Sequence, residues 1–470
     1  MKVSSLKSIV LFLSFTATVF SCSKKDNTAT EVPTVSTLEI FEITDNSAKT
    51  ISEVIDNGGG EIISKGVCYG TSVDPSISES KTTDGGGMGS FLSEIEGLEP
   101  EKEYFIRAYA TNEIGTAYGK NISFKTTPLP IIKGDLNLDS QAEIDLLFKS
   151  DIEIIEGDLY VGLRSDFNKS AVINSLSSMS SLKEVKGDLV IINTRSLKNL
   201  EGLNNIEKIG RNIIISHNQD LSDIDIFNNF IKLEGGITLI SNPELVELNG
   251  FNSVTSLSGD LRISGNDKLE SISGLESLSS ISGELSIWYN LSLQNISGLK
   301  NLTSIQTEKN WYQALSIVYN DKLTDLEGFN QLKEIKGGLK IDSNAGLESL
   351  DGLNNLTKID GDLEINNNNV LENIKALSNL ETILRLHING NHKLQTLDGL
   401  ENLKPPSSSN AEISIINNNQ LSDYCAIKDF VSNINNCSDD NSLGCDYSVY
   451  GNAYNPEYED MKNGKCKEEK

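Results

Sequence analysis

The sequence has few of the residues and none of the short motifs that carry most enzyme chemistry. Its 470 residues include only 3 His, at positions 217, 387 and 392. It contains no HExxH metal-binding pattern, no P-loop, no GxGxxG dinucleotide fingerprint and no GxSxG ahead of a suitable helix. Carboxylates are abundant, so a glycosidase-type pair remains an alternative on composition alone. We therefore predict a protein that is not an enzyme and that needs no cofactor.

Basic residues are in short supply as well. Lys and Arg number 40 against 67 Asp and Glu, which gives a formal net charge of −27. Neutralising nucleic-acid phosphates requires an excess of Lys and Arg, so a general nucleic-acid binder is excluded. The simplest interpretation of the acidic balance is a solvated, self-repelling surface.

No apolar run approaches the roughly 20 residues that a membrane-spanning helix needs. The run from Ile9 to Phe20 has only twelve residues, follows Lys2 and Lys7, and leads to Ser21 and Cys22. Residues 1–21 are therefore predicted to be an export signal. The sequence Val19-Phe20-Ser21-Cys22 resembles a bacterial lipobox, and an ordinary signal peptide with an incidental cysteine is the alternative.

The lipobox resemblance implies that Cys22 carries lipid and becomes the first mature residue. Residues 22–34 are polar and suit a tether between a membrane anchor and the first folded domain. The run Lys24-Lys25-Asp26 is similar to the surface-export tags of Bacteroidetes lipoproteins. These resemblances imply a location on the outer membrane at the cell surface, with the membrane as a partner.

The other cysteines divide into one isolated residue and one cluster. Cys68 alternates inward with apolar neighbours and is interpreted as a buried thiol rather than a nucleophile. The cluster lies in residues 425–470 and consists of Cys425, Cys437, Cys445 and Cys466. In an oxidising compartment four cysteines predict two disulfides, with three pairings open. Zinc is the less favoured alternative because no CxxC pair is present.

Residues 35–127 show short alternating strands separated by Gly-rich turns, notably at residues 56–60 and 84–87. Such spacing predicts a β-sandwich. The segment from Leu98 to Tyr104 resembles the tyrosine corner of fibronectin type III-like domains, in which a Tyr hydroxyl bonds to upstream backbone. The resemblance extends over nearly the whole segment and implies a spacer domain.

Most of the remaining chain repeats the phrase Asn-x-x-Leu. The repeated asparagines are Asn218, Asn242, Asn266, Asn290, Asn320, Asn344, Asn368, Asn391 and Asn418. Their successive spacings are 24, 24, 24, 30, 24, 24, 23 and 27 residues, and Thr194 occupies the same slot one repeat earlier. A period of this length is typical of stacked repeat proteins.

One complete repeat runs from Gly259 to Ile281. Leu261 and Ile263 alternate inward as a short strand, and equivalent strands are expected to stack in parallel about 4.8 Å apart. The recurring Asn suits an interior bend, where its amide pairs with backbone groups, so the copies predict an Asn ladder. The Gly before each strand is expected to supply a positive φ at a corner.

These repeats resemble the leucine-rich repeats of the receptor L-domain family over about residues 134–421. The resemblance implies a right-handed parallel β-solenoid at residues 131–424, so the fold class is mainly β. Repeats with regular helices are disfavoured because return segments such as 275–281 are too short. Residues 141–148 suit an N-terminal capping helix, and residues 425–470 suit a C-terminal cap.

No metal site is predicted, although calcium is weighed at four residues of the C-terminal cap. These residues, Asp439, Asp440, Asn441 and Asp446, lack EF-hand spacing, so a solvated loop is the default.

An aromatic cluster marks the candidate binding surface. It consists of Trp288, Tyr289, Trp311, Tyr312 and Tyr319, and it includes both tryptophans of the chain. Tyr289 and Tyr319 occupy equivalent slots on neighbouring repeats. Outward aromatic rows tend to be protein hot spots or platforms for sugar rings. The alternative is that the insertion near residues 308–313 covers these rings as local packing.

The combined features predict a lipid-anchored cell-surface binding or adhesion protein. The sandwich is the spacer, and one face of the solenoid recognises an extracellular protein or glycan that the sequence does not identify. The alternatives are a structural envelope component and an accessory protein in polysaccharide capture.

Overall fold

The computed structural model describes residues 29–164, 170–227, 232–307, 313–405, 412–434, 437–438 and 445–468, with backbone only at 150, 437, 438 and 445. The chain divides into two compact units, Met1–Leu129 and Pro130–Lys470. We call them the sandwich unit and the solenoid unit.

The sandwich unit packs two antiparallel sheets against one apolar core. Its strands are β1 (Thr34–Phe41), β2 (Ala48–Asp56), β3 (Ser64–Gly70), β4 (Ser80–Lys81), β5 (Gly89–Ile95), β6 (Glu103–Thr111), β7 (Thr116–Tyr118) and β8 (Ile122–Lys125). One sheet has the order β1-β2-β5 and the other β4-β3-β6-β7, with β8 also paired to β6. Val54 and Phe91 from the first sheet meet Val67 and Ile106 from the second in the core.

Two expectations for this unit are confirmed by the side-chain contacts. The Tyr104 hydroxyl accepts a hydrogen bond from the Glu99 backbone N–H at 3.0 Å, so it ties the loop before β6 to that strand. Cys68 on β3 is fully buried and in no disulfide. Burial raises the pKa of its thiol to about 11, so the thiol stays protonated and inert at neutral pH.

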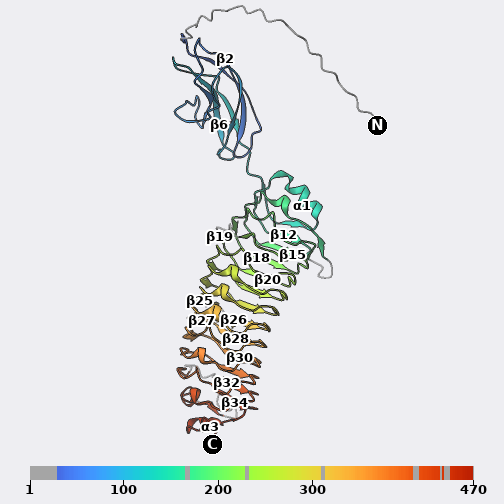
Figure 1. Ribbon diagram of the computed structural model, residues 1–470, viewed down its shortest axis with the longest axis vertical. Coiled ribbons are helices and arrows are strands. Elements are labelled where there is room, and N and C mark those ends of the chain that lie inside the picture. Colours follow the sequence, from blue (N-terminus) through green and yellow to red (C-terminus); the bar gives the residue numbers. More distant parts are fainter. Residues whose placement is uncertain are drawn as a thin grey trace, which may run out of the picture. The chain divides into compact units, whose positions relative to one another are not determined.

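The solenoid unit is a stack of coils with one long parallel sheet along its side (Figure 1). The sheet has 14 strands. In order they are β10 (Leu136–Leu138), β12 (Leu159–Gly162), β15 (Leu189–Ile192), β18 (Ile213–Ser216), β20 (Ile237–Ile240), β22 (Leu261–Ser264), β24 (Leu285–Trp288), β26 (Gln313–Val318), β28 (Gly338–Asp342), β30 (Leu363–Asn366), β31 (Leu386–Asn389), β32 (Glu412–Ile416), β34 (Cys445–Tyr450) and β33 (Cys437–Ser438). We call it the main sheet.

Shorter strands line a second side of the coils. They form the sheet β9 (Ile131–Ile132), β11 (Ile154–Ile155), β14 (Glu184–Val185), β17 (Lys208–Ile209) and β19 (Lys232–Leu233), and the sheet β21 (Ser256–Leu257), β23 (Ser280–Ile281), β25 (Ser304–Gln306), β27 (Glu334–Lys336) and β29 (Lys358–Ile359). A separate pair is β13 (Ala171–Val172) with β16 (Thr194–Arg195).

In the described part of the repeats, the helical turns of the return segments are single 3-10 turns, as their length predicts, and two further 3-10 turns adjoin the cap helices α1 and α2. These turns are η1 (Phe148–Ser150), η2 (Ser177–Met179), η4 (Ser273–Leu275), η5 (Ser297–Leu299), η6 (Glu327–Phe329), η7 (Lys375–Leu377) and η8 (Cys425–Ile427). Helices with several turns would need more residues than a coil of this period leaves between its strands.

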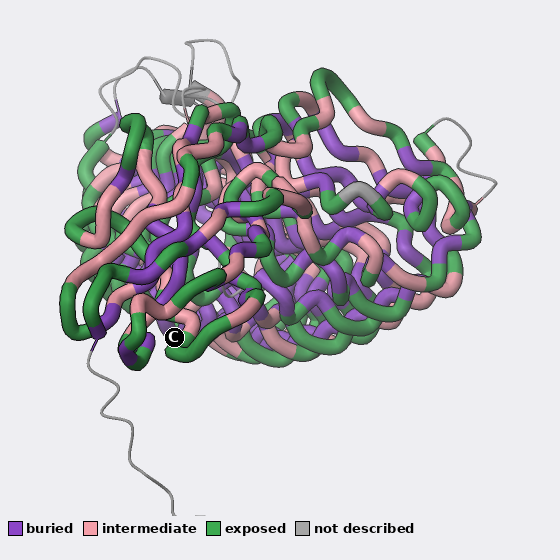
Figure 2. The backbone as a smooth tube through the Cα atoms, turned by 90° about the horizontal axis from the view of Figure 1, so that it is seen from above, coloured by how far each residue is buried: buried purple, intermediate pink, exposed green. Residues whose placement is uncertain are grey.

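The apolar alternation of the sequence becomes vertical stacks of identical side chains. In the register of the main sheet, Leu261 pairs with Leu285, and Ile263 pairs with Ile287. All four side chains are fully buried. Figure 2 looks along the stack and shows buried positions inside the coils and exposed positions at the outer bends. One coil cannot bury its own Leu and Ile side chains, so each coil depends on its neighbours.

The nine repeated asparagines form one fully buried column. Each amide donates to the side-chain oxygen of the asparagine on the next coil over 3.0–3.4 Å. Each also donates to a strand carbonyl on the preceding coil over 2.7–3.1 Å. The column thus satisfies carbonyl groups that the bend at the end of each strand leaves unpaired. It begins at the Thr194 hydroxyl and continues past Asn418 to Asn452.

The expectation that the Gly before each strand has a positive φ is wrong at most coils. Gly187, Gly259, Gly283 and Gly361 all lie outside the positive-φ region. Glycine is needed there for close approach: a Cβ on Gly259 would lie 2.8 Å from the Gly236 backbone nitrogen of the preceding coil. The positive φ lies instead on the residue just before the column asparagine, for example 57° at His217 and 57° at Ser343.

Both ends of the stack carry a cap. At the start, α1 (Gln141–Leu147) buries Ile144, and its N-terminus is closed by a capping box between Ser140 and Glu143, so the predicted helix is confirmed. At the end lie the short helices α2 (Lys428–Ser432) and α3 (Tyr458–Lys462). A disulfide joins Cys425, at the start of this cap, to Cys466, near its end. Of the three pairings that the sequence left open, the structure shows the one that contains this bond. Among the described residues, no helix is both long and apolar enough to traverse a bilayer.

Candidate ligand-binding face of the solenoid

The structure places three of the five predicted aromatic residues together on neighbouring coils. Trp288 is the last residue of β24 and is 36% exposed. Tyr289 and Tyr319 follow β24 and β26, and their rings stack with centroids 4.6 Å apart. Trp311 and Tyr312 lie outside the described residues. An exposed aromatic surface therefore lies where β24 and β26 end.

The two tyrosines occupy a backbone position that disfavours them. Both precede a column asparagine and have φ of 55°, the left-handed conformation that this position adopts along the column, where other coils carry Gly, Asn, Ser or, at position 217, His. A left-handed conformation costs a bulky residue on the order of 1–2 kcal/mol relative to glycine. Tyr289 and Tyr319 are also 50% and 41% exposed, so burial does not offset this cost. The strain recurs along the column, and what distinguishes these two coils is the pair of large, exposed rings at the strained position.

The asparagine column fixes the backbone beneath these rings. The Trp288 carbonyl accepts a hydrogen bond from the Asn290 amide at 3.0 Å and another from the Gly265 N–H at 3.0 Å. The Tyr289 N–H donates to the Val318 carbonyl on the next coil at 2.9 Å. The aromatic rings are therefore presented from a backbone that both neighbouring coils hold in place, which lowers the entropy cost of binding.

A hollow of about 600 Å³ lies beside Trp288 on the outer face of the main sheet. Its lining comes from four consecutive strands and the residue before one of them: Ile240, Arg262, Ser264, Glu284, Ser286, Trp288 and Gln313. We call it the Trp288 hollow. Its volume falls within the range of roughly 300–1,000 Å³ that is typical of small-molecule sites.

The hollow arises from side-chain size on adjacent strands. Ile240, Ser264 and Trp288 are at equivalent positions on β20, β22 and β24, so the small Ser264 lies between two large side chains. Strands are spaced by about 4.8 Å, so Ile240 and Trp288 stand about 10 Å apart. A flat group of ring size fits such a gap.

Charge is balanced within the hollow. Arg262 donates to a Glu284 oxygen at 3.2 Å and also pairs with Asp260 at 2.8 Å. The Ser286 hydroxyl donates to the other Glu284 oxygen. The Glu284 side chain is only 15% exposed, so this pairing is partly shielded from water. The lining of the hollow therefore pairs one guanidinium with one carboxylate in fixed positions, and a second carboxylate, Asp260, lies beside them.

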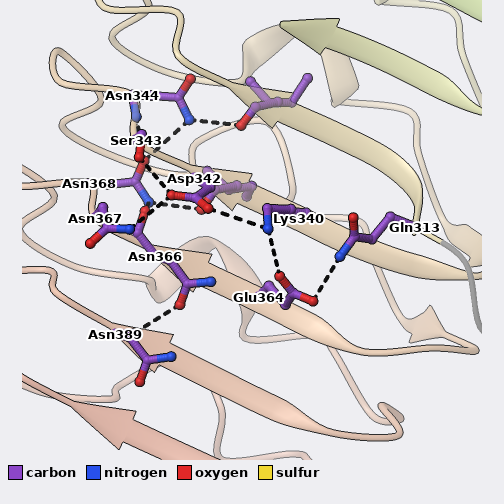
Figure 3. A network of polar contacts seen from close by, with 12 residues as sticks. Gln313, Lys340, Asp342, Ser343, Asn344, Glu364, Asn366, Asn367, Asn368 and Asn389 are labelled. Atoms are coloured by element: carbon purple, nitrogen blue, oxygen red, sulfur yellow. Dashed lines mark hydrogen bonds and ion pairs between the residues drawn. The ribbon is translucent and has the colours of Figure 1, made fainter.

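A second polar network fixes Gln313. The Gln313 amide donates to one Glu364 oxygen at 2.8 Å, and Lys340 donates to the other at 3.1 Å (Figure 3). Burial lowers the pKa of Lys340, but its hydrogen bond to Glu364 and the nearby negative charges outweigh that effect and hold the pKa above its ordinary value. Lys340 thus stays charged and anchors Glu364, which in turn orients the Gln313 amide.

The remaining predicted site residues have other positions. Cys22 and the calcium candidates Asp439, Asp440 and Asn441 lie outside the described residues, as do the side chains of Cys437 and Cys445. Asp446 accepts a hydrogen bond from Ser448 at 2.8 Å. Within the described ranges, no group of three or more His, Cys, Asp or Glu side chains is placed to hold a metal ion.

Sequence reasoning missed most of the lining of the hollow. Arg262, Ser286 and Gln313 each lie in an outward slot that any polar residue could fill, so their side-chain types carried no signal. One signal was available: the coil from Asn290 to Asn320 is six residues longer than its neighbours. It shifts the register at the start of β26, where Gln313 lies.

Replacing both stacked tyrosines with Asn tests whether they serve packing or binding. We expect the double variant Tyr289→Asn/Tyr319→Asn to change the free energy of unfolding by less than about 1 kcal/mol. Relief of two strained conformations offsets the loss of one ring stack, worth about 0.5–1.5 kcal/mol. Urea denaturation followed by far-UV circular dichroism measures the change. A loss of about 2 kcal/mol or more would instead identify the rings as core packing.

Comparison with known proteins gives one family match, within the later repeats. Residues 254–344 and 333–434 both match the receptor L domain family. A comparison with curated proteins gives no match. Among solved structures, the sensor domain of the anti-sigma factor RsgI4 of Pseudobacteroides cellulosolvens is similar, with 17% sequence identity and a TM-score of 0.17. That alignment covers 22% of this chain and 100% of the sensor domain, and at that score the likeness carries no weight. The family match supports the parallel β-solenoid of the repeats.

Proposed function

We propose that the chain is a lipid-anchored cell-surface binding protein whose main sheet recognises an extracellular ligand at the Trp288 hollow. The observation that carries the proposal is the hollow itself. It combines an exposed aromatic face with polar side chains that are already oriented by their neighbours. Preformed, mostly concave sites of this kind are the usual form of small-ligand recognition.

The other parts of the chain fit this role. The lipobox-like sequence ending at Cys22 supplies the anchor, and the polar residues after it supply the tether. The fibronectin type III-like sandwich acts as a spacer between the membrane and the solenoid. A structural envelope component is the second candidate, but it leaves the strained and exposed Tyr289 and Tyr319 without a purpose.

Surface display with and without the lipid site tests the anchor, and ligand capture tests the binding role. Cells that express the full chain are expected to retain it in the membrane fraction, and the Cys22→Ala variant is expected to release it or leave its signal uncleaved.

Capture of extracellular proteins and glycans by the displayed wild type is compared with the Trp288→Ala variant. The matched control is Tyr450→Ala, since Tyr450 is an exposed aromatic at the same slot of β34, away from the hollow. Capture that both variants leave unchanged would reject the proposal.

A further inference from the structure

The Trp288 hollow is amphipathic along a single direction. One side offers Trp288 and Ile240, and the other offers Arg262 and Gln313. A matching ligand therefore needs one apolar face and a rim of hydrogen-bonding groups. A wholly apolar ligand would displace water from the free donors and acceptors of Arg262 and Gln313 without replacing its hydrogen bonds, which costs about 1–3 kcal/mol for each group.

The charge pairing in the hollow selects against charged ligands. An anion would be repelled by Glu284 and Asp260, the two carboxylates that already pair with Arg262 at 3.2 and 2.8 Å. A cation would meet Glu284, but both oxygens of that carboxylate already accept hydrogen bonds, from Arg262 and from Ser286. Breaking a partly shielded pair to form another gives little net gain. A neutral ligand can use the remaining hydrogen-bonding capacity without breaking either pair.

We propose that the Trp288 hollow binds a pyranose ring within an uncharged oligosaccharide. A sugar ring has a C–H face that packs on an indole and equatorial hydroxyls that both donate and accept. The backbones of Ile240 and Trp288 stand about 10 Å apart with the small Ser264 between them, which leaves room for one ring between the two side chains. This inference rests on the proposed function and names the ligand class for the same site.

Two side chains give the hollow its polar specificity. The Gln313 nitrogen is committed to Glu364, which leaves the amide oxygen as the acceptor that faces a ligand hydroxyl. The Arg262 guanidinium has five N–H donors and uses only some of them on its two carboxylate partners. One fixed acceptor and one fixed donor on the same rim can pair with vicinal hydroxyls.

The hollow is open to the outer face of the sheet. An oligosaccharide can therefore place one ring in the hollow while its other rings extend along the surface. The exposed, stacked Tyr289 and Tyr319 lie directly after Trp288 and its neighbouring strand. They offer a second aromatic surface for the next ring along the chain. We therefore expect affinity to rise from a monosaccharide to an oligosaccharide of the same sugar.

The test uses the full-length chain in lipid nanodiscs and a defined panel of glycans. The neutral probes are cello-, xylo-, manno- and chito-oligosaccharides, and the charged probes are oligogalacturonides and heparin fragments. Binding is measured by calorimetry at low and high salt for the wild type, Trp288→Ala, Trp288→Tyr and the control Tyr450→Ala. We expect at least one neutral oligosaccharide to bind with little salt dependence, because no ion pair forms.

The variants decide the outcome. Trp288→Ala is expected to weaken that binding by about tenfold or more, Trp288→Tyr to restore part of it, and Tyr450→Ala to leave it unchanged. Binding confined to the charged glycans, with steep salt dependence, would overturn the inference. Trp288-dependent capture of a protein and of no glycan would also overturn it while leaving the proposed function intact. If Trp288→Ala changes no binding to any glycan or protein in the panel, both the inference and the proposed function are overturned.

Discussion

The Asn368→Ala variant is expected to lower the free energy of unfolding of the solenoid by about 3–5 kcal/mol. Asn368 donates to the Ile341 carbonyl at 3.0 Å, and its side-chain oxygen accepts from both the backbone and the side chain of Asn344 at 3.1 and 3.2 Å. Truncation removes these three buried hydrogen bonds, at about 1–3 kcal/mol for each group that loses its partner. Guanidinium denaturation followed by tryptophan fluorescence isolates the solenoid, since both tryptophans lie in its repeats.

The chain provides a matched control one residue away. Asn369 is exposed, so Asn369→Ala makes the same chemical change at a position outside the column. We expect that control to shift the free energy of unfolding by no more than about 0.5 kcal/mol. Equal effects at Asn368 and Asn369 would show that the column does not stabilise the stack.

Removing the Cys425–Cys466 disulfide is expected to cost about 4 kcal/mol. The bond joins residues separated by 41 positions, and loop-closure entropy for a loop of that length gives about 4 kcal/mol. Because each coil is stabilised by its neighbours, the loss of the cap should loosen the last coils first. Hydrogen exchange in the double variant Cys425→Ala/Cys466→Ala should therefore rise in β32 and β34 before it rises in β22 and β24.

A second cysteine variant separates the disulfide from general effects of cysteine removal. Cys68 is buried in the sandwich unit and is in no disulfide, so Cys68→Ala should leave exchange in the solenoid unchanged. Treating the wild type with a reducing agent should reproduce the double variant. If exchange at β32 stays unchanged under both treatments, the bond does not hold the cap.

The repeat architecture was readable because its signals are local and periodic. The spacing of Asn-x-x-Leu defines the coil length, and the Leu and Ile alternation defines which side chains enter the core. Sequence reasoning nevertheless ended the column at Asn418, whereas the structure extends it to Asn452, 34 residues later. That extension has no Leu three positions on, so the phrase used to find the others could not find it.

For the glycines before the strands, the sequence showed the recurrence correctly but the predicted cause, a positive φ, was wrong at most coils. Their recurrence was visible, but a glycine can serve either a positive φ or a close approach, and sequence does not distinguish the two. The structure shows close approach between coils at Gly259 and Gly361. The positive φ belongs to the residue before the column asparagine, and Tyr289 and Tyr319 occupy that position on two coils.

By itself, the sequence determined the coil period, the buried column, the mainly β fold and the aromatic residues of the candidate binding face. Each of these follows from residue type at a fixed spacing, because one coil repeats the environment of the next. Only the tertiary structure decided the Trp288 hollow, the pairing of Arg262 with Glu284, the hydrogen bond from Gln313 to Glu364 and the disulfide partner of Cys425. These depend on side chains from different coils that meet at the surface, where packing imposes no repeated residue type and leaves no periodic trace.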